Sequence, residues 1–103
     1  MKYTYDDEKS KLFLDLDEEL DVSSCRSLRN IIDGYIMRYE PRELVINLTN
    51  VKFMDSSGIG LLIGRYNLLK LLDSKMTVIN ATKSIKRVLE LSNIAKKINL
   101  RSE

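Results

Sequence analysis

The stretch ELVINLTNVKFMDSSGIGLLIGRYNLLKLL, residues 43–72, indicates how this chain folds. It begins with an apolar, β-branched run, residues 43–48, which is typical of a strand buried on both faces of a sheet. After a connector, residues 49–55, apolar side chains recur at helical spacing. These are Ile59, Leu62, Ile63, Tyr66, Leu69 and Leu72. A buried strand followed by an apolar helix predicts an α/β fold with parallel strands.

The residues before this stretch predict two strands and a helix. Residues 3–5 and 12–16 show two-residue alternation and are separated by a charged turn, which predicts an antiparallel pair. Helical spacing of apolar residues then predicts a helix that Ser23 or Ser24 caps and that cannot continue past Pro41. Its expected inward-facing side chains are Leu28, Ile31, Ile32, Tyr35, Ile36 and Tyr39.

The residues after this stretch predict a strand, a helix and a short terminal element. Residues 76–80 form another buried-type strand, and Thr82 or Ser84 caps a third helix. Asn93 is suited to a left-handed helix end, and residues 94–100 are expected to form a turn and a short strand. The order of elements predicts an α/β fold in which helices pack against a mixed sheet of four to five strands.

Length and composition limit the classes of protein. A chain of 103 residues suits one domain, residues 1–103, and its 44% apolar and 31% charged residues are typical of a folded domain. The net charge of +2 includes no long basic run, which argues against nucleic acid as a partner. The acidic N-terminus and the lack of an apolar run of ~20 residues predict a cytoplasmic protein rather than an exported or membrane one.

The chain has no histidine and a single cysteine, Cys25. An internal disulfide is therefore impossible, and no metal site of the usual histidine type is expected. Ser-His-Asp and Cys-His machinery is absent as well. An enzyme with Ser56 or Ser57 as nucleophile would need a lysine or carboxylate base, and the G-x-S-x-G pattern is missing, so we do not expect an enzyme.

The sequence Asp55-Ser56-Ser57-Gly58 places hydroxyls and a carboxylate at a predicted helix N-terminus. In one interpretation Asp55 or Ser56 is simply an N-cap. In the other, one of the serines accepts a phosphoryl group, which a helix N-terminus tolerates because its N–H groups and dipole favour negative charge. The same N-terminus also suits a nucleotide or anion sensor, although no phosphate-binding P-loop pattern is present.

Three of the four glycines, Gly58, Gly60 and Gly64, fall within this predicted helix. Each costs roughly 1 kcal/mol relative to alanine in a helix interior, so something must compensate. For Gly64 we expect close packing of the helix against its surroundings. For Gly58 and Gly60, close packing and room for the backbone of a partner are equally good explanations.

Residues 53–66 resemble the signature of the STAS domain of bacterial anti-sigma factor antagonists. The resemblance extends to residues 19–21, 44–48 and 81–92, covers roughly residues 10–100, and is greatest to the sporulation members of the family. The family often has Gly, Asp and Gly where this chain has Glu18, Asn47 and Asn93. The resemblance implies a single STAS domain.

The resemblance also implies a switch. Such an antagonist, when unphosphorylated, binds an anti-sigma factor, an ATP-bound GHKL-type serine kinase, and so releases a sigma factor to activate transcription. The kinase phosphorylates the serine after the aspartate, here Ser56, with Ser57 as the fallback, and a serine phosphatase reverses this. Asp21 matches the acidic residue that family members present to the kinase. No cofactor is implied, and the expected partner-binding residues are Asp21, Ser23, Asp55, Ser56, Ser57, Gly58, Ile59 and Gly60.

Overall fold

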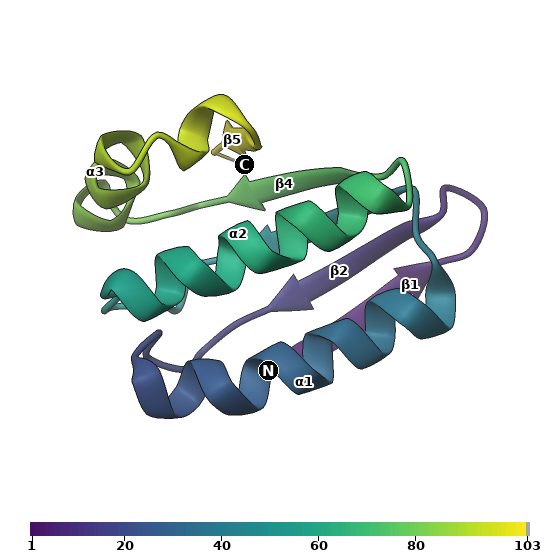
Figure 1. The fold of residues 1–103 in the computed structure, drawn as a ribbon, viewed down its shortest axis with the longest axis horizontal. Coiled ribbons are helices and arrows are strands. Elements are labelled where there is room, and N and C mark those ends of the chain that lie inside the picture. Colours follow the sequence, from purple (N-terminus) through teal and green to yellow (C-terminus); the bar gives the residue numbers. More distant parts are fainter. Residues whose placement is uncertain (103) are drawn as a thin grey trace.

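The computed structural model of the chain describes residues 1–102. Its strands form one sheet in chain order (Figure 1). The strand β1 (Lys2–Asp6) is antiparallel to β2 (Lys11–Asp15), and β3 (Glu43–Asn47), β4 (Lys75–Ile79) and β5 (Asn99–Arg101) continue the sheet in parallel. The predicted antiparallel pair and mixed sheet are confirmed, with five strands.

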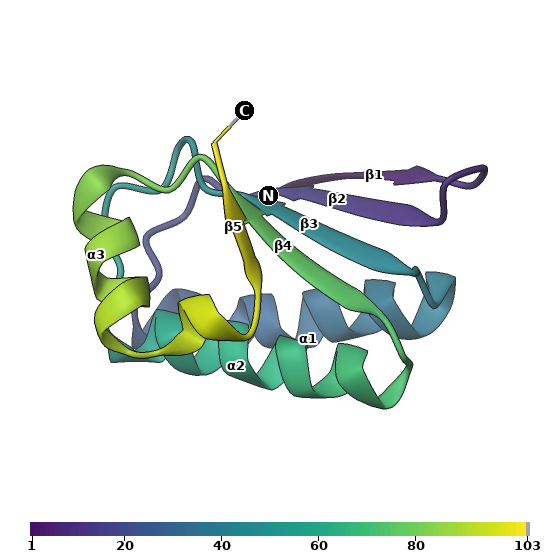
Figure 2. The same ribbon diagram turned by 90° about the horizontal axis from the view of Figure 1, so that it is seen from above.

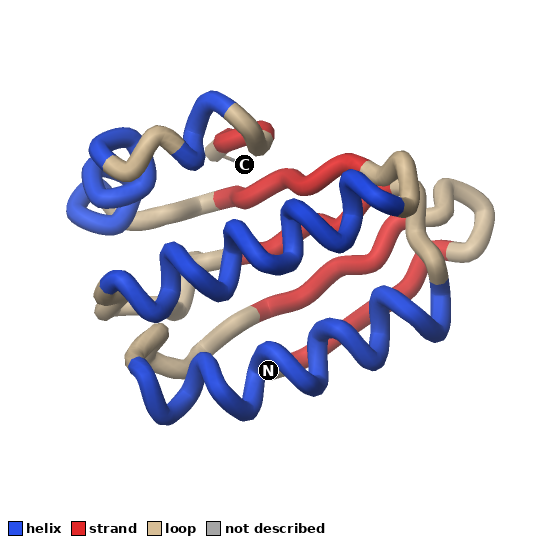
Figure 3. Tube along the Cα trace, in the orientation of Figure 1, coloured by secondary structure: helices blue, strands red, loops and turns tan. Residues whose placement is uncertain are grey.

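Two long helices cover one face of this sheet. The helices α1 (Val22–Tyr39) and α2 (Ser56–Leu71) lie side by side beneath the strands, and α3 (Lys83–Leu91) lies at the end of the sheet (Figures 1 and 2). A 3₁₀ turn, η1 (Ile94–Lys96), leads into β5. Figure 3 shows that the loops gather at the two ends of the sheet. Among residues 1–102, no helix is long and apolar enough to cross a membrane.

The core lies between the sheet and these two helices. The parallel register aligns Leu12 with Leu44 and Met76, and each of these side chains is no more than 3% exposed. The helices cover this row and its neighbour with aliphatic side chains, including Leu28, Ile32, Ile36, Leu62 and Leu69. Burial of apolar area of this kind is the main source of stability in a domain of this size.

The opposite face of the sheet carries a polar network. Asn47 donates to Asp15 Oδ1 (3.1 Å), and Lys11 pairs with Glu43 Oε1 (3.3 Å). Glu43 also accepts a hydrogen bond from the Thr77 hydroxyl. Cross-strand pairs of this kind join β2, β3 and β4 on this face.

The helix ends confirm some predicted caps and correct one. The first helix is capped by Asp21, not by Ser23 or Ser24, because Asp21 is the residue with extended backbone and its Oδ1 accepts from the Ser24 N–H (2.9 Å). Thr82 caps α3 as predicted, and Asn93 has the expected left-handed conformation (φ 66°). Ile31, expected to face inward, is 45% exposed.

Candidate functional site

The N-termini of α1 and α2 lie together at the carboxyl end of the parallel strands (Figure 1). A parallel β-bridge between Leu20 and Met54 joins the loops that enter the two helices. In this bridge the Leu20 N–H donates to the Phe53 carbonyl (3.0 Å) and the Asp55 N–H donates to the Leu20 carbonyl (3.2 Å). Residues 34 positions apart in the chain are therefore held side by side at this end of the sheet, where open α/β sheets bind their ligands.

Each of these helices begins with an aspartate cap. Asp21 Oδ1 accepts from the Ser24 N–H, and Asp55 Oδ1 accepts from the Ser57 N–H (2.7 Å). The cap interpretation of Asp55 is thus correct, and it leaves the hydroxyls of Ser56 and Ser57 without a hydrogen bond to any described residue. Asp21, expected to contact a partner, is also a structural residue.

The two adjacent serines differ in accessibility. Ser56, the first residue of α2, is exposed, whereas Ser57 is half-buried and faces α1. An enzyme that modifies a hydroxyl must reach it, so this geometry favours Ser56 over Ser57.

Cys25 lies beneath the paired N-termini. Burial raises the pKa of its thiol, and the nearby carboxylates of Asp55 and Asp21 raise that pKa further. The influence of both carboxylates on one thiol agrees with the closeness of the two caps. It also keeps the thiol protonated and poorly reactive.

The three glycines of α2 have different surroundings. A Cβ atom at Gly58 would lie 2.5 Å from Met54 Cγ and 3.0 Å from Leu20 Cβ, so close internal packing requires this glycine. A Cβ atom at Gly60 or Gly64 would meet nothing within 4 Å. The expectation that close packing explains Gly64 is wrong, because that side of the helix faces a groove.

The remaining expected contact residues lie around the same end of the helices. Ser23 is exposed in the first turn of α1, Ile59 is half-buried in α2, and Gly60 is exposed one residue further on. The expected residues therefore all lie at the N-terminal ends of α1 and α2, but Gly58 is buried and Ile59 packs partly against the core.

Two apolar residues of this surface did not emerge from the sequence as contact residues. Val22 is 61% exposed and Phe53 is 47% exposed, and each lies within two residues of the bridge between Leu20 and Met54. Their signal in the sequence is weak, since an apolar residue beside a helix cap is usually part of the core. Exposed apolar side chains next to polar ones are typical of a protein-binding surface.

No group of three or more Cys, Asp or Glu side chains that could hold a metal ion occurs among residues 1–102. The site contains exposed hydroxyl groups, two carboxylates that cap helices, and the exposed apolar side chains of Val22 and Phe53. Such a surface suits docking of a protein and modification of a serine.

Comparison with known proteins identifies relatives of the chain. A family model described as STAS domain matches residues 3–103. The anti-sigma F factor antagonist of Paenibacillus polymyxa is 34% identical over 85 residues, which are 82% of this chain and 73% of that protein. The anti-sigma-B factor antagonist of Staphylococcus aureus is 31% identical over 77 residues, 74% of this chain and 69% of that protein.

A solved structure shows the same fold. The anti-sigma factor antagonist SpoIIAA in its unphosphorylated form aligns with a TM-score of 0.78 at 24% identity, over 89% of this chain and 80% of its own. The family match along nearly the whole sequence, with the identity to the two antagonists, shows that this chain belongs to the STAS domain family.

Proposed function

We propose that this chain is an anti-sigma factor antagonist that is switched by phosphorylation of Ser56. In its unphosphorylated form it binds an anti-sigma factor, an ATP-bound serine kinase of the GHKL type, in the cytoplasm. The sigma factor released in this way activates transcription, in the sporulation branch that the sequence resembles. Phosphorylation by the kinase ends the binding, and a serine phosphatase restores it.

The observation that carries this proposal is the bridge between Leu20 and Met54. It joins the loop that ends at the Asp21 cap of α1 to the loop that ends at the Asp55 cap of α2. The exposed residues Ser56, Val22 and Phe53 each lie within two residues of it along the chain, which supports a shared binding surface. The names of the two relatives, anti-sigma F and anti-sigma-B factor antagonists, support the class of partner. SpoIIAA, a structural neighbour, has a phosphorylated form, which supports the kind of switch.

Electrostatics explains how a phosphate on Ser56 would end the binding. It adds about −1.5 to −2 charges, equal in magnitude to the net charge of +2 of the whole chain, directly after Asp55. Burying that charge against a partner carries a large desolvation penalty. The domain itself tolerates the phosphate because it lies at a helix N-terminus.

Phosphomimetic variants test this proposal. Ser56→Asp should bind the anti-sigma factor of the same organism, in Mg·ATP, at least tenfold more weakly than wild type and Ser56→Ala, while its urea midpoint stays unchanged. Ser84→Asp, at an exposed serine in the first turn of α3, is the matched control and should bind normally. Binding of Ser56→Asp to the anti-sigma factor as tight as that of wild type would contradict the proposed switch.

A further inference from the structure

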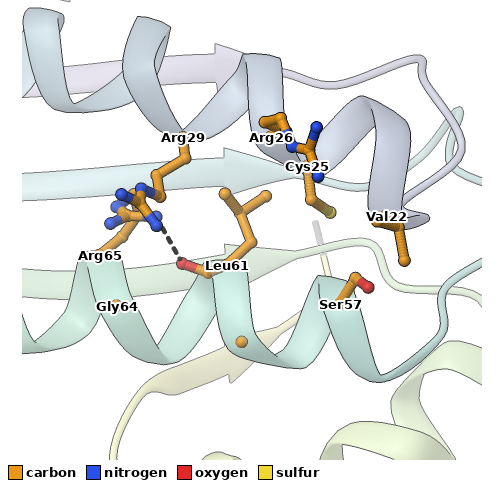
Figure 4. A pocket seen from close by; sticks show the side chains of 9 residues that line it. Val22, Cys25, Arg26, Arg29, Ser57, Leu61, Gly64 and Arg65 are labelled. Carbon is orange, nitrogen blue, oxygen red and sulfur yellow. Dashed lines mark hydrogen bonds between the residues drawn. The ribbon is translucent and has the colours of Figure 1, made fainter.

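A groove with a volume of about 390 Å³ runs between the N-terminal halves of α1 and α2 (Figure 4). On the α1 side, Arg26 and Arg29 line it. On the α2 side the lining includes buried Leu61 and Arg65 and the more exposed Ser57, Gly60 and Gly64, which share one face of the helix because they are three or four residues apart. The groove therefore begins one residue after Ser56 and leads away from it along the helices.

Two of the arginines that line the groove carry positive charge that no residue among 1–102 pairs with. Arg26 and Arg29 are exposed, and neither side chain forms a hydrogen bond or ion pair with another residue in the described part of the chain. Within the described range, residues 1–102, no acidic residue lines the groove. A concave surface of one sign attracts a ligand of the opposite sign.

At the far end of the groove Arg65 is buried and already paired. Its Nε forms an ion pair with Asp33 Oδ1 at 2.7 Å, although the angle does not suit a hydrogen bond. One of its terminal nitrogens donates a hydrogen bond to Asp33 Oδ2 (3.3 Å). The remaining terminal nitrogen donates to the Leu61 carbonyl (3.2 Å; Figure 4). Burial lowers the pKa of Arg65 and the charge of Arg29 lowers it further, against the effect of Asp33. The guanidinium groups of Arg29 and Arg65 are thus close enough for their charges to repel each other.

The wall on the α2 side lacks side chains that the fold would accept. Gly60 and Gly64 weaken the helix relative to alanine, although a Cβ atom at either position would meet nothing within 4 Å. Internal packing therefore does not explain them. Glycine at such positions lets another backbone approach the helix closely.

We infer that this groove binds an acidic segment of the anti-sigma factor, with its carboxylates paired to Arg26 and Arg29 and its backbone against Gly60 and Gly64. The inference rests on the proposed function and deepens it. A segment seated there would end beside Ser56, so a phosphate on that serine would repel it. The groove and the switch residue would then form one continuous binding surface.

Two sets of variants test the inference by measuring the affinity for the anti-sigma factor in Mg·ATP. Arg26→Glu combined with Arg29→Glu should weaken binding at least tenfold and make it less sensitive to salt. Lys86→Glu combined with Arg87→Glu, at exposed positions of α3, reverses the same charge outside the groove and should change the affinity little.

The glycines provide a test that separates a structural role from a binding role. Gly60→Ala and Gly64→Ala should each raise the urea midpoint and yet weaken binding. Gly34→Ala is the matched control, since Gly34 is also an exposed helical glycine whose Cβ would meet nothing within 4 Å, but it does not line the groove. It should raise the midpoint and leave binding intact.

The outcomes separate the inference from the proposed function. If the double arginine variant or the glycine variants bind the anti-sigma factor as tightly as wild type does, the inference is overturned and the proposed function stands. Absence of wild-type binding would overturn both. If the chain alone binds ATP or inorganic phosphate and the double arginine variant does not, the groove is a small-anion site and the inference is also overturned.

Discussion

At the scale of the residue, Gly58 shows how closely the two helix entries are packed. Its missing side chain leaves the space that Met54 and Leu20, the two residues of the bridge, occupy. Gly58→Ala should lower the free energy of unfolding by about 1 to 3 kcal/mol, because a Cβ atom overpacks this contact. Urea unfolding measures the loss, and Gly34→Ala, which should gain up to about 1 kcal/mol, is the control. An unchanged or raised stability of Gly58→Ala would contradict this packing.

Asp21 combines two roles that one substitution can separate. As the cap of α1 it needs an oxygen acceptor, and as a proposed contact it needs a negative charge. Asp21→Asn should keep the stability within about 0.5 kcal/mol, because asparagine caps as well as aspartate, while it weakens binding to the anti-sigma factor. Asp21→Ala should weaken binding as well and should also lower the free energy of unfolding by about 1 kcal/mol, because alanine cannot cap the helix. Normal binding by Asp21→Asn would reduce Asp21 to a cap alone.

At the scale of the element, the polar network on the outer face of the sheet makes stability depend on pH. Burial alone would raise the pKa of Glu43, but the hydrogen bond from Thr77 and the charges of Lys11 and Arg101 outweigh it and hold that pKa below its ordinary value of 4.5. The unfolded chain therefore binds more protons at Glu43 than the folded one does. The contribution of Glu43 to stability is present above about pH 4.5 and is lost as the pH falls through the folded pKa.

Glu43→Gln tests this pH dependence. The difference in free energy of unfolding between wild type and Glu43→Gln should shrink as the pH falls from about 6 to about 3, because the wild type alone loses this contribution. Urea unfolding at several pH values measures it, with Glu90→Gln, at an exposed glutamate of α3, as the control. A difference that stays constant with pH would show that Glu43 does not titrate in this way.

The elements themselves could be predicted from the sequence because each carries a local signal. The apolar runs of β3 and β4 and the alternation in β2 identify strands, and the polar residues before each helix mark where it begins. The choice among neighbouring caps failed at Asp21, because Ser23 and Ser24 are equally good cap residues by type. Which residue has extended backbone there depends on the bridge to Met54, a contact between distant parts of the chain.

At the scale of the whole molecule, the candidate site exists because parallel strands bring several helix N-termini to one end of the sheet. That much follows from the order of elements, because helices that follow parallel strands begin at the carboxyl ends of those strands. The arginine-lined groove could not be foreseen. It depends on how α1 and α2 pack. For the same reason the cost of a glycine inside a helix suggested close packing at Gly64, where the fold leaves open space.

The most direct test of the account is to locate the phosphate. The chain, Ser56→Ala and Ser57→Ala are each incubated with the anti-sigma factor and Mg·ATP, and intact and digested protein is analysed by mass spectrometry. We predict a single phosphate on Ser56, present in wild type and Ser57→Ala and absent from Ser56→Ala. Phosphate on Ser57, or no phosphate in any of the three, would contradict the claim that exposed Ser56 is the switch.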